Sequence, residues 1–224
     1  MSRREQLKEQ TYQEIIATAR QQIAEKGAAA LSLRGIARRM EMTAPALYRY
    51  FEDRDGLVTA LIVTAYQSLQ ESLEAVRLAH QDQDSAGQLL AVGMAYREWA
   101  LAHPEDYALI FGTPIPGYQA PPESTLPLAR SSLGVLIQVV EDGWKRGEFD
   151  LSGDVPALSP ALLEGQPEMA QAAPGILTAL ALWSLVHGLT SLELFGHFTT
   201  LLQDPAELYR RELENQLKLL LTKE

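Results

Sequence analysis

The 224-residue sequence contains no cysteine, so a disulfide framework, a thiolate metal site and a cysteine nucleophile are all excluded. Its four histidines are scattered, and none forms a close ligand pair with a neighbouring carboxylate. We find no catalytic triad and no phosphate-binding loop. The sequence therefore predicts a protein with no metal, no cofactor and no catalytic residues.

A long uninterrupted apolar run is also missing. The longest apolar region, residues 176–194, is interrupted by Ser184, His187, Thr190 and Glu193. This pattern is typical of a buried helix and not of a membrane span. The first ten residues, MSRREQLKEQ, lack the apolar core of a signal peptide. We expect a soluble, cytoplasmic protein that makes no membrane contact.

Positive charge is scarce overall but concentrated at the N-terminus. The chain has 19 Lys and Arg against 29 Asp and Glu, a formal net charge of -10. Residues 1–54, which we call the head, hold ten basic and seven acidic residues, a net of +3. The body, residues 55–224, holds nine and 22, a net of -13. This asymmetry indicates a head that meets a polyanion, with chance fluctuation as the alternative explanation of the charge alone.

Helical periodicity runs through almost every long segment, and no convincing alternating strand pattern appears. The sequence predicts an all-α protein of about nine or ten helices. In the head, the caps and apolar spacing predict a helix that stops at Gly27, one beginning after Ser32, and one from Thr43 to about Phe51. In the body we expect a loop at 112–122 and helices at about 53–79, 86–103, 104–111, 126–146, 157–164, 175–196 and 205–221.

The two short helices between Ser32 and Phe51 have the pattern of a helix-turn-helix. Leu47 and Phe51 are four residues apart, which places both on one face of the second helix and fixes it to the core. Ala44, Pro45 and Ala46 are small residues at the leading end of that helix, as a helix needs in order to approach base edges in the major groove.

The segment LSLRGIARRMEMTAPALYRYFEDRDGL closely resembles the DNA-binding region of TetR-family transcriptional regulators. The matching positions are Ile36-Ala37, Thr43, Leu47-Tyr48, Tyr50-Phe51, Arg54 and Leu57. Glu41 departs from the pattern, because the turn normally has glycine there. The resemblance implies a helix-turn-helix domain over residues 1–54 and a helical ligand-binding and dimerisation domain over residues 55–224.

Residue by residue, the resemblance implies phosphate contacts for Thr43, Tyr48, Tyr50 and Arg54. It implies base-edge roles for Arg34, Ala44, Pro45 and Ala46. Arg34 is the side chain able to make a bidentate contact to guanine, and a contact to phosphate only is the alternative. Arg38 and Arg39 are better explained as a solvated face.

Two segments of the body, YREWALAHPEDYALIF and ALWSLVHGLTSLELFGHF, resemble a TetR C-terminal subgroup named for its Trp-His-Gly signature. Trp183 and His187 lie four apart on one helical face. An apolar pocket with a few polar groups is the usual form of a small-molecule site. Our ligand-binding candidates are Tyr96, Trp99, Phe111, Trp183 and His187. The alternative is that they fill the core and that His187 bonds to a nearby carbonyl.

The last helix carries more apolar surface than one neighbour would bury, through Leu202, Leu208, Leu213, Leu217, Leu220 and Leu221. In the TetR family two C-terminal helices of each subunit usually form a four-helix dimer interface. We therefore expect a homodimer, with a monomer as the alternative. The resemblance further implies that the dimer binds a near-palindromic double-stranded DNA operator and is released by a small, largely apolar effector.

Two other kinds of function stay open at this point. One is a helical enzyme that uses His187 with Glu193, or His103 with Glu105. The other is an interaction module whose head binds a protein partner.

Overall fold

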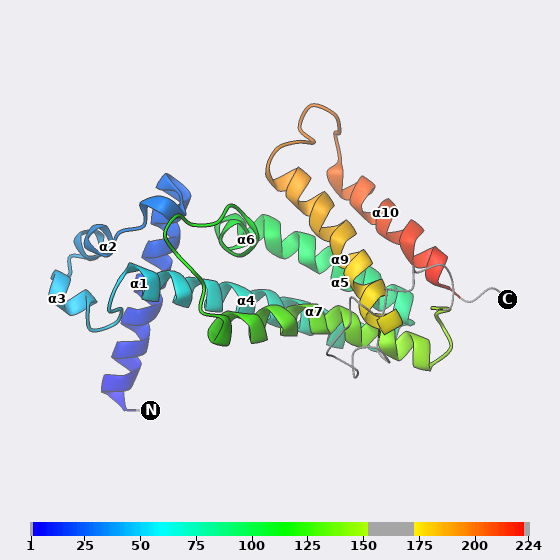
Figure 1. The fold of residues 1–224 in the computed structure, drawn as a ribbon, viewed down its shortest axis with the longest axis horizontal. Coiled ribbons are helices and arrows are strands. Elements are labelled where there is room, and N and C mark those ends of the chain that lie inside the picture. Colours follow the sequence, from blue (N-terminus) through cyan, green and yellow to red (C-terminus); the bar gives the residue numbers. More distant parts are fainter. Residues whose placement is uncertain (1, 152–172, 222–224) are drawn as a thin grey trace. The chain divides into compact units, whose positions relative to one another are not determined.

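The computed structural model describes residues 2–151 and 173–221. Within these ranges the protein has nine α-helices, one 3-10 helix and no β-strand, which confirms the all-α class (Figure 1). The helix expected at 157–164 lies outside the described residues. The elements are α1 (Arg3–Lys26), η1 (Ala28–Ala30), α2 (Leu33–Arg39), α3 (Ala44–Leu47), α4 (Arg54–Ala79), α5 (Ser85–Ala102), α6 (Pro104–Phe111), α7 (Pro122–Lys145), α9 (Ala173–Leu194) and α10 (Pro205–Leu220).

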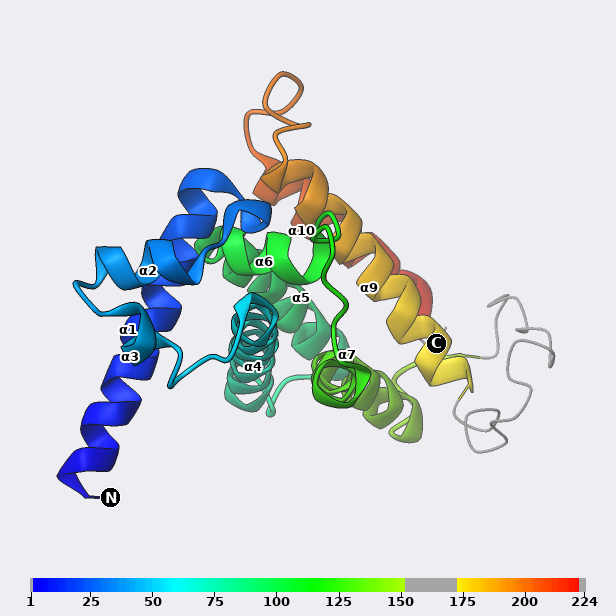
Figure 2. The same cartoon turned by 60° about the vertical axis from the view of Figure 1, so that its left-hand side comes forward.

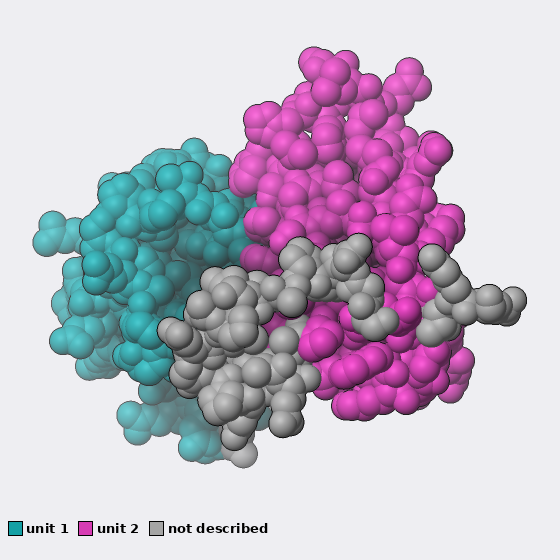
Figure 3. All heavy atoms as spheres, turned by 45° about the vertical axis from the view of Figure 1, so that its right-hand side comes forward, with its two compact units in different colours: residues 1–67, 103–128 teal, residues 68–102, 129–224 magenta. Residues whose placement is uncertain are grey.

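The chain divides into two compact units, which Figure 3 colours separately. Unit 1 comprises residues 1–67 and 103–128, and unit 2 comprises residues 68–102 and 129–224. Unit 1 therefore contains the whole predicted head together with the first half of α4, α6 and the loop that follows α6. A functional boundary at residue 54 stays a prediction.

The core of unit 1 begins with the apolar stripe of α1. Ile15, Ile16 and Ala19 are fully buried, as the periodicity predicts. Ser2 and Glu5 form a capping box at the start of α1, and Gly27 ends it with a positive φ of 78°. α1 contacts α2, and α2 contacts α3, in the arrangement that Figure 2 shows.

Leu47 and Phe51 fix the second helix of the pair to this core, since they are 1% and 6% exposed. That helix is shorter than predicted: α3 ends at Leu47, and residues 48–50 form turns. The amide of Tyr50 donates to the carbonyl of Leu47 at 2.9 Å, so the α-helical bonding has tightened into a three-residue turn.

The start of α7 also differs from the prediction. The helix begins at Pro122, four residues before the predicted start at 126, and it carries Pro127 inside. The prolines made this segment look like loop, but proline at the first helical position loses no hydrogen bond because that N–H is unpaired in any helix.

The turn between α2 and α3 has the backbone expected for glycine at a residue that is not glycine. Glu41 has a φ of 55°, the one positive φ among the described non-glycine residues. The turn is closed by the amide of Met42, which donates to the carbonyl of Ala37 at 2.8 Å. A side chain in this left-handed region crowds its own backbone, so the position carries local strain.

Glu41→Gly is expected to raise the free energy of unfolding by about 0.5–1 kcal/mol, because glycine adopts this φ without a Cβ clash. Urea denaturation at one fixed protomer concentration measures the change. Glu41→Ala is the control, since it removes the charge and keeps the Cβ. Equal gains from the two variants would show that charge, and not backbone strain, is the cause.

Unit 2 is built on contacts among α5, α9 and α10. α10 approaches α5 closely at Gly93, where an added Cβ would lie 2.4 Å from Leu213 Cδ2. The hydroxyl of Tyr209 donates to the carbonyl of Gly93 at 2.7 Å. Arg97 of α5 donates hydrogen bonds to both carboxylate oxygens of Glu193 on α9, at 2.6 and 2.5 Å. A glycine contact, a buried tyrosine and an ion pair thus hold three helices together.

α9 is apolar but only partly covered. By length and composition the stretch Pro174–Leu194 could cross a membrane, a test that core helices of soluble proteins also pass. Of the 18 consecutive residues that form its most apolar stretch, only 33% are buried. The predicted helix is confirmed, whereas its burial by the described residues is incomplete.

Candidate functional site

The predicted DNA-reading side chains lie on the surface of the helix-turn-helix. Arg34 on α2 is exposed, as are Thr43 and Pro45 at the start of α3, and Ala44 and Ala46 are half-buried. Tyr48 follows α3 directly and is 46% exposed. Thr43 occupies the N-cap position of α3, yet its hydroxyl does not cap the helix. The small tip is thus flanked by an arginine, a free hydroxyl and a phenol.

Arg49 and Tyr50 follow α3 in the chain and lie near the start of α1. Tyr50 is half-buried against the core of unit 1, while Arg49 is exposed. Both line a concavity of about 510 Å³ together with Glu5, Lys8 and Glu9. The sequence places Arg49 off the core face but not among the named DNA contacts, and its exposure beside Tyr48 makes it a candidate cation for a phosphate.

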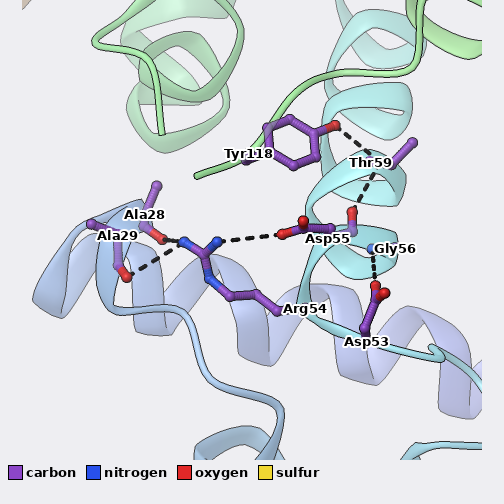
Figure 4. A network of polar contacts seen from close by, with 8 residues as sticks. All are labelled: Ala28, Ala29, Asp53, Arg54, Asp55, Gly56, Thr59 and Tyr118. Carbon is purple, nitrogen blue, oxygen red and sulfur yellow. Dashed lines mark hydrogen bonds and ion pairs between the residues drawn. The ribbon is translucent and has the colours of Figure 1, made fainter. Parts of the chain in front are cut away.

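The guanidinium of Arg54 contacts other residues of unit 1 (Figure 4). Its Nη2 atom donates to the carbonyls of Ala28 and Ala29 in η1, at 3.2 and 3.4 Å. Its Nη1 atom lies 3.5 Å from Asp55 Oδ1. A phosphate contact by Arg54 stays a prediction, and it would have to compete with the contacts that hold α4 to η1.

The five ligand-binding candidates are distributed over both units, and their role in binding stays a prediction. Tyr96, Trp99, Trp183 and His187 belong to unit 2, whereas Phe111 belongs to unit 1. The Tyr96 hydroxyl and His187 Nδ1 are 3.0 Å apart, and the Trp183 and His187 rings stack at 5.1 Å. Trp99 Nε1 donates to the hydroxyl of Ser68 at 3.0 Å. Phe111 packs edge-on against Tyr66 at 6.1 Å.

These contacts resemble core packing more than an open site. Tyr96 and Trp99 are 2% and 4% exposed. Burial lowers the pKa of His187, which favours the neutral ring. The partner of its Nδ1 atom is the Tyr96 hydroxyl. Glu193, the proposed enzymatic partner of His187, is held by Arg97 on both oxygens.

Comparison with known proteins extends these observations to the whole chain. Residues 15–61 match the family described as "Bacterial regulatory proteins, tetR family", and residues 89–215 match "Tetracyclin repressor-like, C-terminal domain". The chain is 33% identical over 217 residues to the HTH-type transcriptional regulator Rv1816 of Mycobacterium tuberculosis, covering 93% of this chain and 92% of that protein.

Solved structures agree. The crystal structure of SCO4313, described as a regulatory protein, has a TM-score of 0.79 and 39% identity, covering 97% of this chain and all of that one. A TetR of Acinetobacter baumannii solved with minocycline has a TM-score of 0.56 at 17% identity, covering 91% of this chain and 92% of that one, a likeness of fold alone. The helix-turn-helix geometry and these matches lead to one conclusion: the chain belongs to the TetR family of DNA-binding transcriptional regulators.

Proposed function

We propose that this regulator is a homodimeric repressor that binds a near-palindromic operator and is released by a small effector. The observation that carries the proposal is the exposed tip of Thr43 to Ala46, flanked by Arg34 and Tyr48 and fixed from beneath by Leu47. One such tip reads only a short half-site. Two tips related by a two-fold axis would reach successive major-groove faces about 34–36 Å apart.

Uncovered apolar surface on the last two helices supports the dimer. Leu192 on α9 is 42% exposed, and Leu219 on α10 is 75% exposed. Leu213 and Leu217, which the sequence assigned to the interface, are instead buried inside the chain. The proposed interface therefore uses the outer faces of α9 and α10, which lie side by side (Figures 1 and 2). Exposed apolar faces of this kind mark association sites.

Effector release requires two conformations of the protein with different affinity for DNA. An effector shifts the balance only if it binds one conformation more tightly than the other. We propose repression as the natural role, because an effector that favours the weaker-binding form then switches the controlled gene on.

Arg34→Ala is expected to weaken operator binding by about 1–3 kcal/mol, roughly 5- to 150-fold, and to relax the preference for guanine at one position of each half-site. The loss follows from removing a bidentate contact to a base edge. The measurement is an electrophoretic titration against the DNA upstream of the chain's own gene, with competitor DNA present.

Arg38→Ala is the matched control, because Arg38 is an exposed arginine on the same helix. It is expected to change the affinity only slightly. If wild-type protein gives no specific shift at low salt, the repressor proposal is wrong. If both variants lose affinity equally and without a change in base preference, Arg34 contacts only phosphate.

A further inference from the structure

Unit 1 contains a cavity of about 270 Å³ beneath the loop of residues 112–121, which we call the α6–α7 loop. Its walls include Ile62 and Tyr66 of α4, Leu109 and Ile110 of α6, and Ile115 and Tyr118 of the loop. A cavity of about 150 Å³ holds benzene, and drug-sized ligands take roughly 300 Å³ or more. The space therefore suits a molecule between these two sizes.

The lining of this cavity is apolar with a few hydroxyl groups. None of its described lining residues is charged. The Thr125 hydroxyl is already used, because it donates to the carbonyl of Pro121 at 3.0 Å. Tyr66 has no hydrogen-bond partner among the residues that the structure describes, and burial raises the pKa of its phenol. Tyr66 therefore offers one neutral O–H donor to an occupant.

The cavity wall is continuous with the core that fixes the recognition helix. Ile62 and Ile115 belong to the same hydrophobic cluster as Leu47 and Phe51. Tyr66 and Tyr118 pack against that cluster from the cavity side. An occupant would thus contact side chains that also determine how α3 is held.

A chain of polar contacts leads from Tyr118, which lines this cavity, to η1 (Figure 4). The hydroxyls of Tyr118 and Thr59 are 2.9 Å apart. Thr59 donates its one proton to the carbonyl of Asp55 at 2.9 Å, so Tyr118 must be the donor to Thr59. The Asp55 carboxylate faces Arg54, and Arg54 donates to the carbonyl of Ala28 in η1, which is separated from α2 by Leu31 and Ser32.

We propose that the cavity under the α6–α7 loop is the effector site, and that it takes a small neutral, largely apolar molecule with one hydrogen-bond acceptor. Tyr118 is the residue that transmits its occupancy. The Tyr118 ring lines the cavity while its hydroxyl holds Thr59, so an occupant that displaces the ring breaks the link to α4. This inference rests on the proposed function, since it assigns a site to the effector of that repressor.

Binding is tested without DNA, by NMR of protein carrying ¹³C-labelled isoleucine δ1 methyl groups. The probes are 2-naphthol and n-octanol, each neutral, largely apolar and carrying one oxygen that can accept a hydrogen bond. The signals of Ile62, Ile110 and Ile115 are expected to shift in a saturable way with at least one probe. Ile176 on α9 belongs to unit 2 and is expected to stay unchanged.

Ile110→Trp fills the cavity and is expected to abolish the shifts. Ala120→Trp, at an exposed loop position that also lines the cavity, serves the same purpose if the first variant fails to fold. The site assignment is overturned if no probe shifts the three signals, or if both filling variants fold and the shifts persist.

Transmission is tested with Tyr118→Phe, which keeps the ring and removes the hydroxyl. The probe that binds wild-type protein is expected to lower its DNA affinity about 5- to 150-fold, the usual range of allosteric coupling. In Tyr118→Phe the probe is expected to bind within about twofold of wild type, while its effect on DNA affinity falls to about twofold or less.

The outcomes separate the two proposals. Saturable methyl shifts in a protein that never binds DNA would refute the repressor and keep the site. DNA binding with no methyl shifts would keep the repressor and refute the site. Full coupling in Tyr118→Phe would refute the role of its hydroxyl.

Discussion

Glu193→Ala is expected to lower the free energy of unfolding by about 3–5 kcal/mol, the usual effect of removing one partner of a buried ion pair. The side chains of Arg97 and Glu193 are 12% and 14% exposed, so water solvates neither charge well. The hydrogen bonds that Arg97 donates to the Glu193 carboxylate raise the pKa of Arg97 further, and a guanidinium does not deprotonate in proteins. The variant therefore leaves a positive charge without its partner. Urea denaturation at one fixed protomer concentration measures the loss, because the stability of a dimer depends on concentration.

Two further variants separate burial from charge. The double variant Arg97→Met with Glu193→Leu removes both charges and is expected to be clearly more stable than Glu193→Ala. Glu141→Ala breaks an ion pair with Lys145, whose side chain is 66% exposed, and is expected to cost about 0.5 kcal/mol or less. If Glu193→Ala costs no more than Glu141→Ala, the Arg97 pair is solvated in solution.

The sequence predicted those parts of the fold whose signals are local. The stripe of Ile15, Ile16 and Ala19 recurs at helical spacing within a single helix, so it needs no knowledge of the partner. Ser32 caps α2 by accepting from the amide of Gly35 at 3.3 Å, and both residues lie within one turn. The helix boundaries of α4, α5 and α6 followed from signals of the same kind.

Contacts between distant residues could not be predicted in this way. Arg54 matched a family position by its type, but its partners are carbonyls of residues 28 and 29, and a carbonyl has no sequence signature. Tyr96 and His187 were singled out as polar groups of a pocket. The structure pairs them with each other across 91 positions, and no local signal in the sequence indicates that contact.

The α6–α7 loop is a second case in which the sequence did not predict a contact between distant residues. Its prolines and glycines predicted a loop correctly, because these residues act on the local backbone. They contain no information about which surface the loop covers. The contact of Tyr118 with Thr59 on α4 decides that, and it gives the loop a place in the candidate effector site.

Operator affinity is expected to fall on the order of 10²–10³-fold when monovalent salt rises from about 50 to about 200 mM. The acidic body, with a net charge of -13, repels DNA, so attraction depends on a few exposed cations of the head such as Arg34 and Arg49. If each head neutralises about two or three phosphates, a dimer releases the counterions of about four to six. The slope of log affinity against log salt, from titrations at several salt concentrations, measures that number.

Arg49→Ala is the variant that identifies one of these cations. Each lost phosphate contact is expected to reduce the slope by about 0.9, so a dimer that loses one contact per head loses about 1.8. The affinity is expected to fall for all DNA sequences alike, since a phosphate contact reads no base. Lys145→Ala is the matched control, because Lys145 is an exposed cation at the C-terminal end of α7 and should leave the slope unchanged. An equal change in both variants would mean that DNA affinity depends on net charge alone, and that Arg49 makes no phosphate contact of its own.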